Sequence, residues 1–256
     1  MTQPRRRESS TIVVMKWIPA FARMTRIKNR YRQMNRIFSV AIVLIFAVLG
    51  WVIFFRLPME ASMGITQKIM YLHVPIIWTS FLAFLLAFIS SILYLWKRLE
   101  RIDILAHASV EIGVVFCGLA LITGSIWARP TWNTYWTWDA RLTTTLILFL
   151  IFVGYLLLRK FTDVGESQAR MCAVVAIVGF LDVPLIHMSV VWWRTLHQPS
   201  TMFSPKKNVI DTPLMMILWV SVAAFTLLFI YLLNKRMTLE RRSRQFQQAA
   251  ADLDQF

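Results

Sequence analysis

Six long runs of apolar residues constrain the fold of this chain more than any other feature. Five contain no Asp, Glu, Lys or Arg: residues 37–55, 74–96, 112–128, 142–158 and 212–234. A sixth, 171–193, is interrupted by Asp182 and His187. A helix needs roughly 17–25 such residues to cross a bilayer, whereas buried helices of a soluble protein keep a polar face. We therefore predict an all-α integral membrane protein, a bundle of six transmembrane helices.

The positions of the basic residues predict how this bundle is oriented. Six spans place both chain ends on one side, and 21 of the 28 Lys and Arg residues fall on that side. Because Lys and Arg are retained in cytoplasmic segments, we predict that both termini are cytoplasmic. Segments 56–73, 129–141 and 194–211 then face outward and carry the functional loops. The net charge of +15 reports topology, and no nucleic-acid partner is expected.

The six spans divide the chain into three parts. Residues 1–36 form a basic cytoplasmic extension, residues 37–234 the membrane domain, and residues 235–256 a polar cytoplasmic tail. Three readings of the extension stay open: an amphipathic helix on the lipid surface, an organelle transit peptide, or a non-functional stretch preceding a start at Met34. The tail is rich in helix-forming residues and is expected to fray.

Most of the chain carries no reactive residues in a catalytic pattern. Cys117 and Cys172 both fall within predicted spans and form no C-x-x-C pair, so we interpret them as small packing residues. No nucleophile or catalytic triad is evident, and we assign no catalytic residue.

The central outward segment is dense in aromatic residues. Tryptophan and tyrosine do gather at membrane interfaces, which explains one or two rings per helix end but not a cluster interspersed with Asp and Arg. A shelf of rings suits a flat apolar ligand with acidic groups at its edge, because rings stack on such faces and arginine holds carboxylates. Haem has that form. The candidate residues are Trp127, Trp132, Tyr135, Trp136, Trp138, Asp139 and Arg141.

Two histidines make the haem interpretation more specific. His73 lies at the outer mouth of the second span and His197 just beyond the outer end of the fifth, so both flank the aromatic segment. An imidazole on each side of a porphyrin iron gives bis-histidine ligation. We expect these ligands to lie on loops, which suits a protein that releases its haem.

The remaining polar residues are weaker candidates. Any of the bases Lys68, Arg129, Arg141 and Arg194 is placed to meet a propionate. Asp139 either pairs with Arg141 or orients a haem-binding group. His107 lies at the inner end of the third span and is interpreted as an interface residue, and His187 as a structural or supporting one. Asp182, inside the fifth span, needs a partner or a proton.

The run Trp-Asn-Thr-Tyr-Trp-Thr-Trp-Asp-Ala-Arg-Leu-Thr at 132–143 resembles the tryptophan-rich WWD signature of haem-handling proteins in cytochrome c biogenesis. With the Tyr-Leu-His-Val-Pro and Trp-Trp-x-Thr-Leu-His-Gln segments, the chain is similar to the haem exporter protein C (CcmC) family. The resemblance runs from about residue 34 to the end of the sixth span.

The resemblance implies a function. His73 and His197 would be the axial ligands of a transiently bound haem b, the tryptophans and Asp139 its platform, and Lys68 and Arg141 its propionate contacts. Family members present haem at the periplasmic face of the bacterial inner membrane to the chaperone CcmE and work with CcmA, CcmB and CcmD. The mitochondrial inner membrane is the alternative location.

Some positions depart from the family pattern. Asn133 stands where glycine is usual, Val191 where an acidic residue is expected, and Asp182 is not expected at its position. Arg194 has no family counterpart, so we give it less weight as a propionate contact.

Two other function classes remain open. An electron-transfer cytochrome b would carry facing histidine pairs within its spans. A haem transporter subunit would line a polar path through several spans. A larger haem lyase with the same signature is disfavoured by the short chain.

Overall fold

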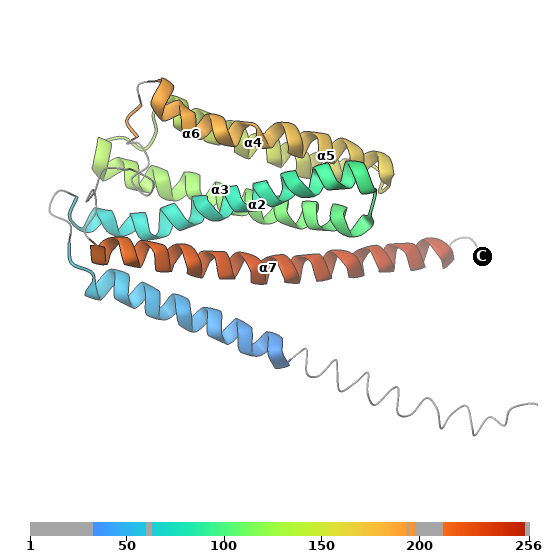
Figure 1. The fold of residues 1–256 in the computed structure, drawn as a ribbon, viewed down its shortest axis with the longest axis horizontal. Helices are drawn as coiled ribbons and strands as arrows, with labels where there is room; N and C mark the ends of the chain where they lie inside the picture. Colours follow the sequence, from blue (N-terminus) through green and yellow to red (C-terminus); the bar gives the residue numbers. More distant parts are fainter. Residues whose placement is uncertain (1–32, 60–62, 194, 198–211, 254–256) are drawn as a thin grey trace, which may run out of the picture. The chain divides into compact units, whose positions relative to one another are not determined.

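The computed structural model describes residues 33–59, 63–193, 195–197 and 212–253. The chain divides into two units, Met1–Val48 and Leu49–Phe256. The described part of the first unit, residues 33–48, is helical and belongs to the apolar helix Gln33–Arg56, whose end lies in the second unit. The second unit holds all the elements discussed below (Figure 1).

Six helices in the described residues are long and apolar enough to cross a membrane. After the π-helical turn η1 (Val52–Arg56) and the 3-10 turn η2 (Ile65–Ile69), the chain forms α2 (Met70–Lys97), α3 (Glu100–Trp132), α4 (Ala140–Phe161), α5 (Glu166–Phe180), α6 (Asp182–Trp192) and α7 (Thr212–Leu253). The predicted class, an all-helical integral membrane protein with six spans, is confirmed.

The α2–α3 pair forms the centre of the second unit. α7 packs on one side of this pair, and α4, α5 and α6 lie on the other (Figure 1). Small residues let the two central helices approach closely, as is common between membrane helices. A Cβ added at Gly113 would lie 2.6 Å from the Phe84 ring, and Ser80 Oγ donates to the Gly113 carbonyl at 3.0 Å.

The core between the α2–α3 pair and the helices α4, α5 and α6 contains stacked aromatic rings. Phe84 of α2 stacks on Phe152 of α4, with ring centroids 3.9 Å apart. Cys117 and Cys172 are free thiols buried in the same cluster, which confirms their interpretation as packing residues.

The fifth span is not one straight helix. The ladder of α5 ends at Phe180, Leu181 N donates to Val178 O at 3.2 Å, and α6 starts at Asp182. Pro184 lies in the first turn of α6, where its missing N–H would have had no helical partner. The break follows from that proline.

Two helices extend further than the sequence predicted. α3 continues through Pro130 to Trp132, so the outward connection shrinks to residues 133–139. α7 continues to Leu253, and the expectation of a frayed tail is wrong for residues 235–253.

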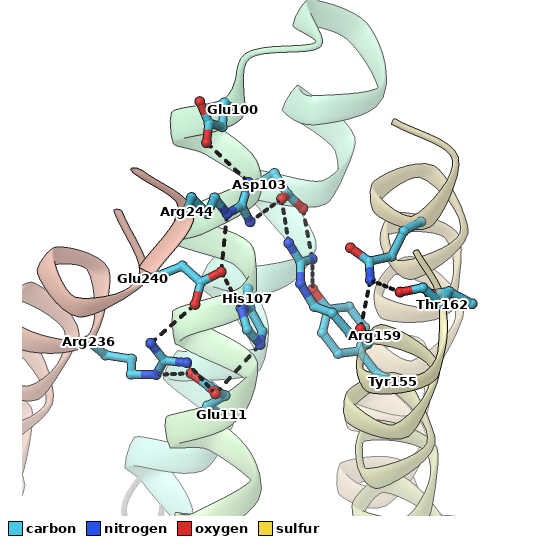
Figure 2. Close-up of polar contacts among 11 residues, drawn as sticks. Glu100, Asp103, His107, Glu111, Tyr155, Arg159, Thr162, Arg236, Glu240 and Arg244 are labelled. Atoms are coloured by element: carbon cyan, nitrogen blue, oxygen red, sulfur yellow. Dashed lines mark hydrogen bonds and ion pairs between the residues drawn. The ribbon is translucent and has the colours of Figure 1, made fainter. Parts of the chain in front are cut away.

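The extension of α7 is held to α3 by ion pairs, shown in Figure 2. Arg236 Nη2 donates to Glu111 Oε1 at 2.7 Å, and Arg244 Nη2 donates to Asp103 Oδ2 at 2.7 Å. Asp103 also accepts from Arg159 Nη1 of α4 at 2.9 Å, and both side chains of that pair are buried. We call this group the ion-pair end of the bundle; its other members are Glu100, His107, Tyr155, Thr162 and Glu240.

Candidate functional site

The predicted site residues gather at the other end of α3. Asp103 lies near the start of this helix and Trp127 near its end, which at 1.5 Å per residue separates them by about 35 Å. The start of α2, the end of α3, the start of α4 and the segment after α6 all meet there (Figure 1). We call this the imidazole end of the bundle.

His73 lies in the first turn of α2, not on a loop as expected. Its ring faces α3. Nδ1 lies 3.0 Å from Thr123 Oγ1, and the ring centroid lies 5.7 Å from that of Trp127. His73, which was expected on a loop, thus belongs to the central helix pair.

His197 lies on the chain beyond α6 and is held by α4. Its Nδ1 lies 3.2 Å from Asp139 Oδ2, and its ring meets Trp132 edge-on with centroids 4.7 Å apart. A carboxylate only accepts hydrogen bonds, so Nδ1–H donates to Asp139. The lone pair of His197 is therefore on Nε2, the nitrogen through which this side chain can coordinate a metal.

The surroundings of His197 favour the neutral imidazole. Burial and the nearby Arg141 guanidinium lower the pKa of His197 from its ordinary 6.5, and Asp139 opposes them. Neutral imidazole is the form that binds metals. The side chain is thus ready to act as a ligand at neutral pH.

Asp139 holds two elements together. It is the N-cap of α4, where Oδ1 accepts from Leu142 N at 2.9 Å, while Oδ2 faces His197. Of the two roles left open by the sequence, orienting a candidate ligand is the one its contacts match.

Arg141 lies in the first turn of α4, two residues after Asp139 and close to both histidines. Electrostatic interactions join it to His197 and Asp139, and His73 interacts with both Arg141 and His197. No hydrogen bond or ion pair joins its guanidinium to another residue that the structure describes. The Arg141 guanidinium is therefore an uncommitted cation, which here means a positive charge near two imidazoles with no hydrogen bond or ion pair among the described residues.

The tryptophans divide into an inner and an outer set. Trp127 and Trp132 contact the two imidazoles. The indole N–H groups of Trp127 and Trp136 and the Thr143 hydroxyl are buried without a hydrogen-bond partner among the described residues. Buried donors without partners are costly, so these atoms are candidates to contact a ligand.

The outer set is open to the surroundings. Trp138 packs edge-on against Trp136, with centroids 5.6 Å apart, and is largely exposed. Tyr135 is 61% exposed and lies under the Arg129 guanidinium, 5.6 Å from its ring centroid. These two rings form an exposed rim and touch neither imidazole.

Lys68 is not part of the imidazole cluster in its contacts. Its ammonium donates to the carbonyl of Phe54 at 2.7 Å, and the residue is 7% exposed. It joins η2 to the end of the first apolar helix. In the structure Lys68 therefore contacts the backbone of Phe54, whereas the sequence predicted a contact with a haem propionate.

The other histidines lie away from the cluster. His187 packs against Phe81 at 5.3 Å and its Nδ1 lies 3.0 Å from its own helix carbonyl, Val183 O. His107 lies between Glu111 and Glu240 at the ion-pair end. Asp182 Oδ2 is buried without a partner among the described residues. Arg194 and residues 198–211 lie outside the described residues.

Sequence reasoning missed Thr123 and Gly124. They lie inside an uncharged span, where a threonine and a glycine are common in membrane helices. The available signal was their spacing from Trp127: positions i and i+4 lie on one face of a helix, one turn before the aromatic segment.

The chemical types of the side chains in this cluster suit an iron porphyrin. His197 faces Asp139 through Nδ1, which leaves Nε2 as its metal-binding nitrogen, and neither Arg141 nor the indole N–H groups of Trp127 and Trp136 have a hydrogen-bond partner among the described residues. Such a ligand offers an iron for imidazoles and carboxylates for a guanidinium. The class defined by fold and site is a polytopic helical membrane protein with paired imidazoles at one end of its bundle.

Comparison with known proteins assigns the family. The family described as "CcmC: Heme exporter protein C" matches residues 17–252. The chain belongs to this family. The match reaches further at both ends than residues 34 to 234, the extent of the resemblance judged from the sequence.

Several curated relatives carry the same name, "Heme exporter protein C". The one from Bradyrhizobium diazoefficiens is 42% identical over 197 residues, covering 76% of this chain and 75% of its own. The one from Escherichia coli K12 is 37% identical over 64% of this chain and 66% of its own. The one from Haemophilus influenzae is 31% identical over 88% and 92%. The family implies a role in handling haem for cytochrome c maturation.

Proposed function

We propose that this chain binds haem b transiently and non-covalently at the imidazole end and delivers it to a CcmE-like haem chaperone. The observation that carries the proposal is that His73 and His197 lie at the same end of the bundle, each with Nδ1 beside a neighbouring side chain. Holding Nδ1 presents Nε2, the geometry usual for histidine ligands.

The surrounding residues supply the other contacts of this proposal. Arg141 is the propionate contact best supported by the structure, because it is uncommitted and interacts electrostatically with both imidazoles. Trp127, Trp132 and Trp136 flank the macrocycle, and the exposed Trp138 and Tyr135 form the rim. Lys68 becomes a propionate contact only by leaving Phe54.

The chain contributes orientation to this transfer. No residue is proposed as a nucleophile, so the proposed contribution is to turn a bimolecular encounter between haem and chaperone into an oriented one. We place the imidazole end at the periplasmic face of the bacterial inner membrane, both termini in the cytoplasm, and CcmA, CcmB and CcmD as partners. Support comes from the basic-residue distribution and from the name of the family.

Substitution of the two histidines tests the proposal. In detergent-purified protein loaded with haem, His73→Ala or His197→Ala should weaken the haem absorption and shift the Soret band, because one axial nitrogen is lost. The double variant should retain no bis-histidine spectrum. His187→Ala, which removes a histidine packed against Phe81, is the control and should leave the spectrum unchanged.

Adding an apo-chaperone to the haem-loaded protein separates this function from an electron-transfer cytochrome b. A transiently loaded carrier gives up haem to an added apo-chaperone, whereas a cytochrome b retains it in fixed stoichiometry. A double variant with an unaltered spectrum, or loss of the spectrum in His187→Ala alone, would overturn the ligand assignment.

A further inference from the structure

One face of α3 forms a cradle for His73. Thr123 and Gly124 are adjacent, and Trp127 lies one turn further along the helix. Thr123 Oγ1 lies 3.0 Å from His73 Nδ1 and the Trp127 ring lies 5.7 Å from the imidazole centroid. The imidazole is thus contacted by three residues of one helix.

The hydrogen bonds of Thr123 indicate which nitrogen of His73 carries the proton. Its hydroxyl lies 2.8 Å from Leu119 O and 3.3 Å from Ala120 O, two carbonyls that only accept. A hydroxyl has one proton to donate, and with that proton on the nearer carbonyl, Leu119 O, the Thr123 oxygen accepts from His73. Nδ1 then carries the hydrogen, and the lone pair is on Nε2.

Gly124 provides the space that the ring occupies. A Cβ at this position would lie 3.0 Å from Cε1 of His73, 3.6 Å from Nδ1 and 3.8 Å from Nε2. Only a residue without a side chain allows the imidazole to lie this close to the α3 backbone. Any larger residue must move the ring by a few tenths of an ångström.

We propose that Thr123 and Gly124 are positioning residues that fix the tautomer and the plane of His73, so that Nε2 is presented to haem iron. The inference rests on the proposed function of His73 as an axial ligand. It also makes the two ligands unequal: His197 donates to the Asp139 carboxylate and His73 to a neutral hydroxyl. The carboxylate-bound imidazole is the stronger electron donor.

Substitution of Thr123 tests the tautomer. Thr123→Val keeps the shape and removes the acceptor, and Thr123→Ser restores it. In the haem-free protein labelled with ¹⁵N-histidine, His73 should show a protonated Nδ1 in wild type and Thr123→Ser, and a mixture of tautomers in Thr123→Val. Thr79→Val is the matched control, because the Thr79 hydroxyl donates to the Pro75 carbonyl in the same way.

The loaded protein provides a second measurement. Thr123→Val should weaken haem binding by about 10–100-fold, the usual effect of removing a partner of a histidine ligand. The midpoint potential of the bound iron should rise, because the imidazole becomes a weaker donor. Thr123→Ser and Thr79→Val should match wild type in both.

Substitution of Gly124 tests the space beside the ring. Gly124→Ala should weaken haem binding while leaving the melting temperature of the haem-free protein equal or higher, since alanine favours a helix over glycine. Gly154→Ala is the matched control, because a Cβ there would have nothing within 4 Å. A purely structural role would lower stability and haem binding together.

The outcomes separate this inference from the proposed function. If His73→Ala keeps the wild-type haem spectrum, the ligand assignment itself fails. If His73→Ala loses it while Thr123→Val keeps wild-type ¹⁵N shifts, affinity and potential, the positioning role of Thr123 is refuted. If Thr123→Val does not fold, wild-type haem affinity in Gly124→Ala still refutes the cradle.

Discussion

Asp139 shows how much one side chain of the aromatic segment does. It is 8% exposed at the side chain, caps α4 through Oδ1 and holds His197 through Oδ2. The sequence placed it beside Arg141, which suggested a local salt bridge. The carboxylate instead joins the start of α4 to the segment after α6, a contact between residues 58 positions apart in the chain.

Separating the two roles of Asp139 gives a residue-scale prediction. Asn is as good an N-cap as Asp, so Asp139→Asn should keep the stability of α4 but weaken the hold on His197 and reduce haem affinity. Asp139→Ala should also lose about 1 kcal/mol of stability with the cap. Thermal unfolding and haem titration on the same samples distinguish them; equal melting losses in both variants would contradict the division.

The pH behaviour of His197 belongs to the same prediction. Its lowered pKa means that the folded protein disfavours the charged imidazole, so this stability contribution is present above pH 6.5 and is lost as the pH falls through the folded-state pKa. In Asp139→Asn the pKa should fall further, because the charge that raises it is removed. Histidine NMR titration of the haem-free protein measures both; a midpoint above 6.5 would contradict the assignment.

At the scale of the element, helix ends position the site. The C-cap of α3 is Asn133, which adopts a left-handed backbone with φ 58°. This conformation costs most residues about 1–2 kcal/mol and is tolerated by glycine and asparagine. The departure from the usual glycine is therefore a substitution that preserves the turn.

A substitution at position 133 tests that account. Asn133→Gly should stay within about 1 kcal/mol of wild type, whereas Asn133→Val should lose about 1–2 kcal/mol because a β-branched residue is strained there. Thr131→Val, in the ordinary helical backbone of the last turn of α3, is the control. The measurement is thermal unfolding in detergent, and equal stability of the Gly and Val variants would refute the role of the turn.

At the scale of the whole molecule, the second unit has two polar ends joined by apolar spans. The imidazole end holds paired histidines and an uncommitted arginine, and the ion-pair end holds interlocked charges from α3, α4 and α7 (Figure 2). A buried pair such as Asp103–Arg159 contributes to specific packing mainly when both partners are present. The two ends therefore differ in kind: the charges of the ion-pair end are paired with one another, whereas Arg141 at the imidazole end has no ion pair among the described residues.

The orientation of these two ends is a prediction for the whole chain. Tyr135 is 61% exposed at the imidazole end and Phe246 is 76% exposed on the extension of α7. Tyr135→Cys should react with a membrane-impermeant maleimide in intact spheroplasts, and Phe246→Cys only after permeabilisation. The native cysteines are buried and serve as the unlabelled background. The reverse labelling pattern would invert the proposed topology.

The sequence by itself determined the class of fold, because uncharged apolar runs of this length match the thickness of a bilayer and can cross it only as helices. It also indicated His73, His197 and the aromatic segment, whose residue types have specific chemistry. It could not place helix ends: the polar residues of α7 suggested a frayed tail, whereas ion pairs of Arg236 and Arg244 hold the first part of that segment against α3.

Only the tertiary structure decided which side chains act on the histidines. Thr123, Gly124 and Asp139 matter through contacts with residues 50 or more positions away, and Lys68 is occupied by a carbonyl 14 positions earlier. Such contacts depend on how helices pack, which local pattern does not encode. The residue types of the site could be identified from the sequence. The hydrogen-bond partner of each imidazole depended on residues that are distant in the chain and close in the folded structure.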